Sequence, residues 1–150
     1  MGSSYKGSQK DIDALNSYIK LIRSAEAISS KINLELSNYR LTESQFGVLD
    51  ALLHLGPMKH RELGKKILKS DGNITMVINN LEKRELVQRR RSEKDKREFI
   101  IHLTLKGKNK IQETLPIIVK KIKKNFEILN KDEKRELQYL CKAVGLQIRK

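Results

Sequence analysis

A predicted helix near the middle of the chain has one side suited to reading DNA bases. We expect this helix to run from Ser70 to Arg84, with Ser70 as its N-cap, because apolar residues recur there every three or four positions. Its other side is mostly polar and presents Asn73, Thr75, Met76, Asn79, Asn80 and Lys83. The major groove of B-form DNA admits one α-helix, and short polar side chains near the helix N-terminus read its base edges. The pattern therefore predicts contact with duplex DNA.

A basic loop follows this helix and joins two short β-type runs, at residues 86–90 and 99–103. The tip of the predicted hairpin holds the candidate wing contacts Arg91, Ser92, Lys94, Asp95, Lys96 and Arg97. An arginine on a thin loop can enter the minor groove, so we expect Arg97 to be the minor-groove probe. Asp95 lies two residues earlier, and its carboxylate is expected to pair with a basic neighbour and hold the loop in shape.

Positive charge is concentrated in the same part of the chain. Residues 1–58 carry six basic and six acidic side chains, whereas residues 59–110 carry 16 Lys and Arg against seven Asp and Glu. Such a patch attracts a polyanion through electrostatic steering and counterion release. Four lysines are expected to contact phosphates without conferring sequence preference, the alternative being ordinary solvated charge: Lys59, Lys65, Lys66 and Lys69.

Other chemistries have less support in the sequence. The three histidines lack the paired spacing of a metal site, so we expect no metal. Neither a Gly-rich phosphate loop nor a Gly-x-Ser-x-Gly elbow is present, so we expect no enzyme and no cofactor. Cys141 lies on the apolar side of the last predicted helix, where we expect a buried hydrophobe. The alternatives left open are a redox-responsive regulator using Cys141 and a basic helical interaction or RNA-binding protein.

Long amphipathic helices flank the candidate contacts on both sides. One is expected at residues 12–36, about 37 Å long at 1.5 Å per residue, which is too long for a small single-chain core to cover. Another starts after Thr104 and is expected to kink at Pro116 without dividing into two helices. A last helix starts at Asn130, which forms a capping box with Glu133, and its apolar residues are expected to point inward. A partner chain would cover the exposed apolar sides.

Between these long helices the order of elements is that of a winged helix-turn-helix. A helix is predicted from Thr42, whose hydroxyl and Gln45 form a capping box, to the stop signal at Gly56 and Pro57. A short helix at residues 60–68, the polar-sided helix and the basic hairpin then follow.

We therefore predict one domain, residues 1–150, of a mainly α class with a small β-hairpin and about six helices. Residues 42–104 form the DNA-binding region, and residues 10–38 and 105–150 form a helical dimerisation region. No apolar run approaches the roughly 20 residues of a membrane span, and the first residues lack a signal-peptide core. We expect a cytoplasmic protein that does not bind membranes.

The run from Gly72 to Gly107 resembles the recognition helix and wing of the MarR family of bacterial transcription regulators. The most similar parts are Asp95-Lys-Arg97 and Leu103-Thr-Leu-Lys-Gly107. The similarity in helix order covers residues 11–148.

The resemblance implies a homodimer that binds a palindromic operator in double-stranded DNA and represses nearby genes. It implies minor-groove contact by Arg97, a hydrogen-bonding role for Asp95, and release from DNA by a small aromatic or phenolic effector or by cysteine oxidation. This sequence departs from the family at two points. Glu85 stands where a glycine commonly ends the recognition helix, so we expect a looser turn. Lys59 and His60 stand where a Thr or Ser often caps the third helix, so we expect a weaker start or an extra phosphate contact.

Overall fold

The computed structural model describes residues 2–67 and 71–148. The chain forms two compact units, Met1–Ile118 and Val119–Lys150. Six helices and one three-stranded antiparallel sheet occur among the described residues. The predicted fold class is therefore confirmed. Two residues singled out by the sequence, Ser70 and Lys69, lie outside the described residues.

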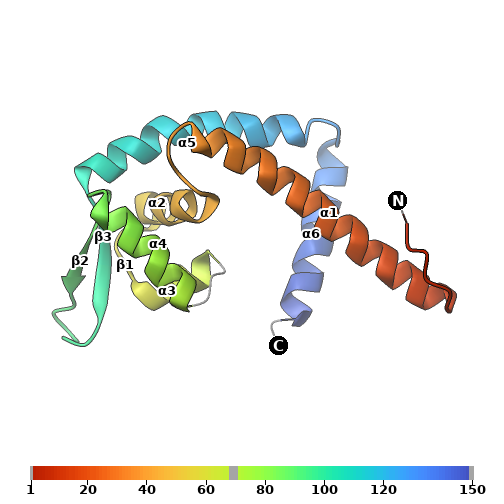
Figure 1. Cartoon of the computed structure of the whole chain (residues 1–150), viewed down its shortest axis with the longest axis horizontal. Helices are drawn as coiled ribbons and strands as arrows, with labels where there is room; N and C mark the ends of the chain where they lie inside the picture. Colours follow the sequence, from red (N-terminus) through yellow and green to blue (C-terminus); the bar gives the residue numbers. More distant parts are fainter. Residues whose placement is uncertain (1, 68–70, 149–150) are drawn as a thin grey trace. The chain divides into compact units, whose positions relative to one another are not determined.

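Capping residues determine where the first two helices begin. Figure 1 shows both helices in the ribbon. Helix α1 (Gln9–Ser37) begins three residues earlier than predicted, because Ser8 and Asp11 form a capping box. Helix α2 (Glu43–Leu55) follows its predicted cap, with the Gln45 N–H donating to Thr42 Oγ1 at 3.2 Å. It ends at Gly56, whose φ of 79° lies in the left-handed region that glycine tolerates.

The sheet has one strand more than the sequence predicted. Strands β2 (Val87–Arg91) and β3 (Phe99–Leu103) form the expected hairpin, with Arg91 opposite Phe99. Strand β1 (Met58–Lys59) pairs with the other edge of β3, opposite Ile101 and Ile100. Two residues are too few to show a β period, so this strand could not be predicted from alternation. It ties the segment before helix α3 (His60–Lys66) to the hairpin.

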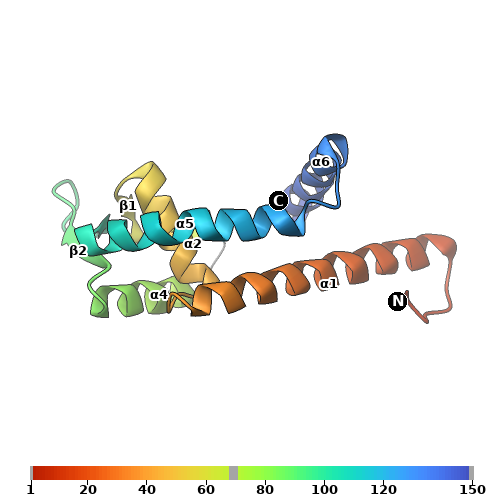
Figure 2. The ribbon, with the colours of Figure 1, turned by 90° about the horizontal axis from the view of Figure 1, so that it is seen from above.

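A shared core fixes the orientation of helix α4 (Asp71–Lys83). Its residues Ile74, Ile78 and Leu81 are fully buried with side chains from α1, α2, α3, β3 and α5, and Val77 packs against them. Helix α4 contacts both α3 and β2, and Figures 1 and 2 show the hairpin beside it. Because the apolar side faces the core, the polar side of α4 faces outward.

The turn after α4 is regular although a glutamate occupies it. Glu85 has a φ of 60°, in the left-handed region that glycine adopts most readily. Its N–H donates to the Glu82 carbonyl at 2.9 Å, and the Leu86 N–H donates to the Leu81 carbonyl at 3.0 Å, which together form a Schellman motif. The expectation of a looser turn is wrong, because both closing hydrogen bonds are made.

The Leu-Thr-x-x-Gly run packs the start of helix α5 (Leu105–Asn125) against this turn. The Thr104 hydroxyl donates to the Glu85 carbonyl at 2.7 Å and accepts from the Gly107 N–H at 3.0 Å. A Cβ on Gly107 would lie 1.9 Å from the Leu86 carbonyl oxygen, so only glycine fits there. Helix α5 continues through Pro116 as one helix, as predicted.

The second unit contains the end of α5 and helix α6 (Lys131–Ile148). Asn130 caps α6 as predicted, because its Oδ1 accepts from the Glu133 N–H at 3.0 Å. No described residue of α6 is buried. The expectation that its apolar side points inward is wrong within one chain, since that side is exposed: Leu137, Leu140, Cys141, Val144 and Ile148. Among the described residues, no helix has the length and apolar character needed to cross a membrane.

Candidate nucleic-acid interface

The outward side of α4 presents the predicted base-reading residues. Asn73, Thr75, Asn80 and Lys83 are exposed, and Asn79 is half-buried. Met76 is 59% exposed, which leaves its methyl group available to a thymine methyl. The described members of the predicted set therefore lie on one accessible surface.

The wing is the hairpin tip, residues 91–98, and Asp95 shapes it. The Arg97 N–H donates to Asp95 Oδ1 at 3.0 Å, and Arg97 Nε lies 3.4 Å from the same oxygen. The predicted pairing of Asp95 with a basic neighbour is confirmed. The Arg97 side chain is 92% exposed, so this contact fixes the loop and leaves the guanidinium accessible to DNA.

Ser92 and Arg91 make their contacts within the wing. Ser92 is only 6% exposed, and its hydroxyl accepts from the N–H groups of Lys94 and Asp95 at 3.2 and 3.3 Å. Its burial leaves it poorly placed for the direct DNA contact we expected, and its hydrogen bonds organise the turn. Arg91 donates to the Lys96 carbonyl at 3.2 Å and lies over the Phe99 ring, whereas Lys94 and Lys96 are exposed.

An arginine that the sequence analysis did not identify connects strand β2 to α4. Arg89 on β2 donates to the Asn79 side-chain oxygen and pairs with Glu82, Nη1 to Oε2, at 3.3 Å. Glu82 also accepts from the Arg89 backbone N–H at 3.3 Å. Arg89 and Glu82 face each other only because β2 folds back beside α4. The signal available in the sequence was the period-two alternation of a strand, which places Arg89 on the same side as the apolar Val87.

Helix α3 and the strand before it carry the predicted phosphate contacts. Lys65 and Lys66 are exposed. Lys59 Nζ forms an ion pair with Glu98 Oε2 at 2.7 Å, and this carboxylate raises the pKa of Lys59. The Lys59 N–H donates to Glu62 at 3.2 Å, so α3 has a cap despite lacking a Thr or Ser there.

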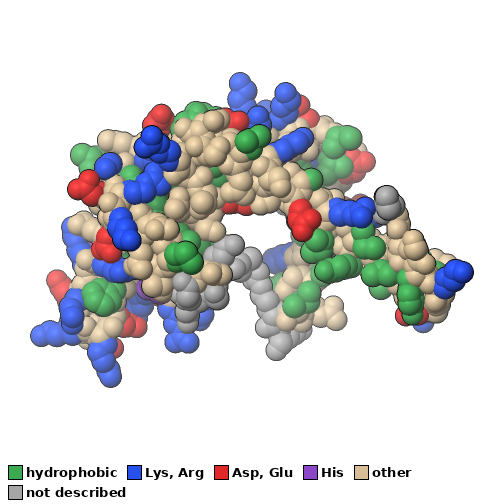
Figure 3. Space-filling model, in the orientation of Figure 1, with side chains coloured by type: hydrophobic (Ala, Val, Ile, Leu, Met, Phe, Trp, Pro, Cys, Tyr) green, Lys and Arg blue, Asp and Glu red, His purple; other side chains and the backbone are tan. Residues whose placement is uncertain are grey.

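A cationic groove separates α3, α4 and the wing. Four of its eight lining residues are lysine or arginine, and within it Thr75 Oγ1 lies 3.0 Å from His60 Nε2. The groove residues are Lys59, His60, Arg61, Thr75, Arg89, Arg97, Glu98 and Phe99. Figure 3 shows Lys and Arg side chains gathered at this end of the first unit. The geometry and charge suit the phosphate backbone of a nucleic acid.

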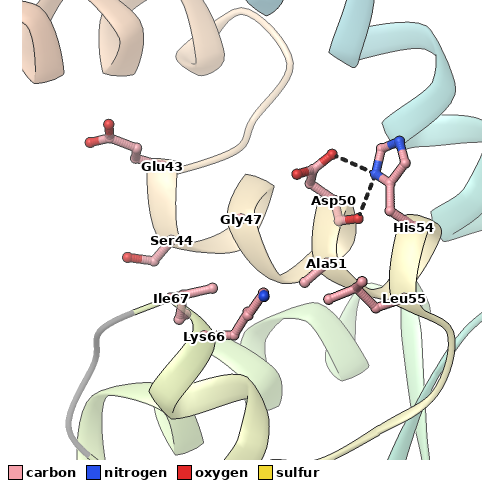
Figure 4. Close-up of a pocket in the computed structure, with 9 residues that line it drawn as sticks. All are labelled: Glu43, Ser44, Gly47, Asp50, Ala51, His54, Leu55, Lys66 and Ile67. Carbon is pink, nitrogen blue, oxygen red and sulfur yellow. Dashed lines mark hydrogen bonds and ion pairs between the residues drawn. The ribbon is translucent and has the colours of Figure 1, made fainter. Parts of the chain in front are cut away.

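A second, open pocket of about 590 Å³ lies between α2 and α3 (Figure 4). Apolar groups from Gly47, Ala51, Leu55 and Ile67 line it beside the Lys66 ammonium. His54 Nδ1 lies 3.0 Å from Asp50 Oδ1 at its edge, and Glu43 and Ser44 complete the lining. Two carboxylates also line the pocket, but Glu43 accepts from the Asn33 side chain at 3.1 Å and Asp50 lies beside His54. The Lys66 ammonium is therefore the group that could attract a small organic anion to the apolar surface.

Comparison with known proteins assigns the chain to a family. The family model described as "Transcriptional regulator SarA/Rot" matches residues 30–114, which span the end of α1, the helix-turn-helix, the wing and half of α5. The uncharacterized HTH-type transcriptional regulator YkoM of Bacillus subtilis (strain 168) is 32% identical over 133 residues, covering 89% of this chain and 86% of that protein.

The chain belongs to the SarA/Rot family of transcriptional regulators. This family consists of regulators and not of enzymes. The predicted resemblance to MarR regulators and the predicted class of function, a helix-turn-helix DNA-binding transcription regulator, are confirmed.

Two solved structures share the fold of this SarA/Rot regulator. Sco3205, a MarR family transcriptional regulator from Streptomyces coelicolor in complex with DNA, has a TM-score of 0.84 at 18% identity and covers 95% of this chain and 91% of its own. BpsR of Bordetella bronchiseptica, whose DNA binding is regulated by 6-hydroxynicotinic acid, has a TM-score of 0.78 at 23% identity and covers 86% of this chain and 98% of its own.

Proposed function

We propose that this regulator binds a palindromic operator as a homodimer and represses transcription until a small aromatic acid releases it. The observation that carries the proposal is the outward polar side of α4 beside a wing whose Arg97 is 92% exposed. Helix α4 enters the major groove, Arg97 enters the adjacent minor groove, and Lys65, Lys66 and Lys94 contact phosphates. The complex of Sco3205 with DNA supports this use of the fold.

The exposed apolar sides of the long helices support a homodimer. In α1, Tyr18 is 62% exposed and Leu21 41%. In α6, Leu140 is 51% exposed and Val144 49%. Apolar patches of this kind on soluble proteins usually mark an interaction surface, and a second copy of the chain is the partner that a palindromic operator requires.

Selection of bound sequences from a random pool of DNA duplexes tests the operator. The proposal expects an inverted repeat whose half-sites lie about 34 Å apart, one helical turn. Footprinting on a duplex carrying the selected repeat should protect both half-sites together. Enrichment of a single unrepeated site, or of no sequence at all, would contradict the proposal.

The pocket between α2 and α3 is the proposed effector site. Its apolar lining accommodates an aromatic ring, and Lys66 offers a cation to a carboxylate. Lys66 is also a predicted phosphate contact, and α3 packs against α4. An acid bound there would neutralise Lys66 and disturb the packing of α3, so effector binding and DNA binding would oppose each other. The regulation of BpsR by 6-hydroxynicotinic acid supports the class of effector.

Lys66→Met and Lys65→Met form a matched pair for this test. Both substitutions remove one exposed charge from α3, but only Lys66 lines the pocket. Each should weaken DNA binding by a similar factor. Only Lys66→Met should weaken the release of DNA by 6-hydroxynicotinate or 4-hydroxybenzoate, measured by fluorescence anisotropy. An equal response of the two variants to these acids would remove the pocket from the proposal.

A further inference from the structure

The side-chain amide of Asn79 on α4 is held by a hydrogen bond from Arg89 on strand β2. Arg89 Nη2 donates to Asn79 Oδ1, while Arg89 Nη1 lies 3.3 Å from Glu82 Oε2. The Arg89 side chain is only 27% exposed, so the contact lies partly out of water, where a charge-assisted hydrogen bond is stronger. The planar guanidinium thus engages two residues of α4 at once.

This contact determines which end of the Asn79 amide is left to contact a base. An arginine side chain has hydrogen-bond donors and no acceptor, so the group it meets must be the amide oxygen. The oxygen of Asn79 is therefore directed at β2, and the amino group at the other end is left as a pair of donors. An asparagine reads adenine with its oxygen and nitrogen together, accepting from N6 and donating to N7. An oxygen turned toward Arg89 does not allow that pairing.

We propose that Arg89 is a positioning residue that makes Asn79 recognise a base edge carrying only acceptors. Guanine presents two adjacent acceptors in the major groove, O6 and N7, whereas cytosine presents a donor that would face the Asn79 donors. Asn79 therefore selects guanine over adenine and cytosine at one position of each half-site. This inference rests on the proposed function, because it requires α4 to lie in the major groove.

The test compares base preferences selected by the wild type and by a set of variants. Asn79→Ala first identifies the position that Asn79 reads, as the one where its guanine preference disappears. In the wild type this preference should be about tenfold over adenine, the order expected for one good base contact. Arg89→Lys keeps the charge and can keep the Glu82 pair, but its ammonium is a single point and cannot also hold Asn79 as the planar fork does. Arg89→Met removes both contacts.

Both Arg89 variants should lose the preference for guanine over adenine at the Asn79 position and keep the preferences elsewhere. Arg90→Met is the matched control, because it removes the neighbouring, exposed charge of the same strand and should leave every preference unchanged. The double variant Asn79→Ala/Arg89→Met should match Asn79→Ala at that position. Circular dichroism confirms that each variant is folded.

The two possible failures are distinguishable. If both Arg89 variants weaken binding to all sequences equally and keep the guanine preference, Arg89 has a structural role only and the inference is overturned. A selected adenine at the Asn79 position in the wild type overturns it as well. If the wild type binds no duplex in low salt, the proposed function fails, and the inference fails with it.

Discussion

Short local contacts leave the wing arginine accessible to DNA. Asp95 accepts from the backbone N–H of Arg97, and the buried Ser92 hydroxyl accepts from two more N–H groups of the turn. The backbone of the loop is therefore held mainly by these N–H contacts, and the Arg97 side chain stays 92% exposed although its Nε lies 3.4 Å from Asp95 Oδ1. A preorganised cation of this kind loses less conformational entropy on binding.

Arg97→Ala should weaken operator binding by about tenfold, in line with roughly 1–3 kcal/mol for a specific base or groove contact. The free energy of unfolding should change by less than about 0.5 kcal/mol, because the side chain is exposed. Anisotropy titrations and urea unfolding measure the two quantities. Arg23→Ala, which removes an exposed charge from α1, serves as the control. Equal operator affinity for Arg97→Ala and wild type would refute the role of the wing.

Substitutions at Glu85 measure the conformational cost of the left-handed turn after α4. A non-glycine residue at a φ of 60° costs roughly 1 kcal/mol, and the Lys106 pair at 3.2 Å is too exposed to offset it. Glu85→Ala removes the pair and keeps the strain, whereas Glu85→Gly removes both. The glycine variant should be more stable than the alanine variant by about 0.5–1 kcal/mol, measured by urea unfolding. An alanine variant at least as stable as the glycine variant would show that the turn stores no strain.

Among the elements, those with local signals were predictable. The capping residues Thr42 and Asn130 predicted two helix starts, whereas Glu85 in place of a glycine predicted a looser turn than the one observed. Strand β1 was not predictable, because its two residues are defined only by pairing with Ile100 and Ile101. Such pairing is a tertiary property with no local period.

The candidate site shows the same division between local and tertiary signals. The pairing of Asp95 with Arg97 spans two residues and was predicted. The contact of Arg89 with Asn79 joins a strand to a helix and was missed, as was the burial of Ser92 under its own loop. The exposed side of α6, with Cys141 on it, has the periodicity of a core helix, and sequence periodicity does not tell which chain covers it.

His102 on strand β3 makes the free energy of unfolding depend on pH. Partial burial, and next the nearby Arg90 charge, lower the pKa of His102 below its ordinary value of 6.5. The unfolded chain therefore binds this proton more readily, so the free energy of unfolding falls as the pH drops below about 6.5. His102→Gln should lose less stability than the wild type between pH 7.5 and pH 5.5 in urea unfolding. Identical losses would show that His102 does not titrate differently in the folded state.

For the whole molecule, the proposed dimer explains why α6 has no buried residue among those described. Leu140→Glu places a charge on its apolar side and should shift the regulator toward monomer at micromolar concentration, with a loss of operator affinity. Gln138→Glu adds the same charge off that side and should leave the assembly unchanged. Sedimentation equilibrium measures both. A monomeric wild type, or a Leu140→Glu variant that stays dimeric, would contradict the proposed interface.

The salt dependence of operator affinity tests the central claim most directly. A dimer that contacts three phosphates through each half should give a slope of log K against log salt of about −5, since each neutralised phosphate contributes about −0.9. Anisotropy titrations of a duplex carrying the selected repeat, at four or five salt concentrations, measure this slope. A slope near zero would contradict the assignment of α4, α3 and the wing as a DNA-binding surface.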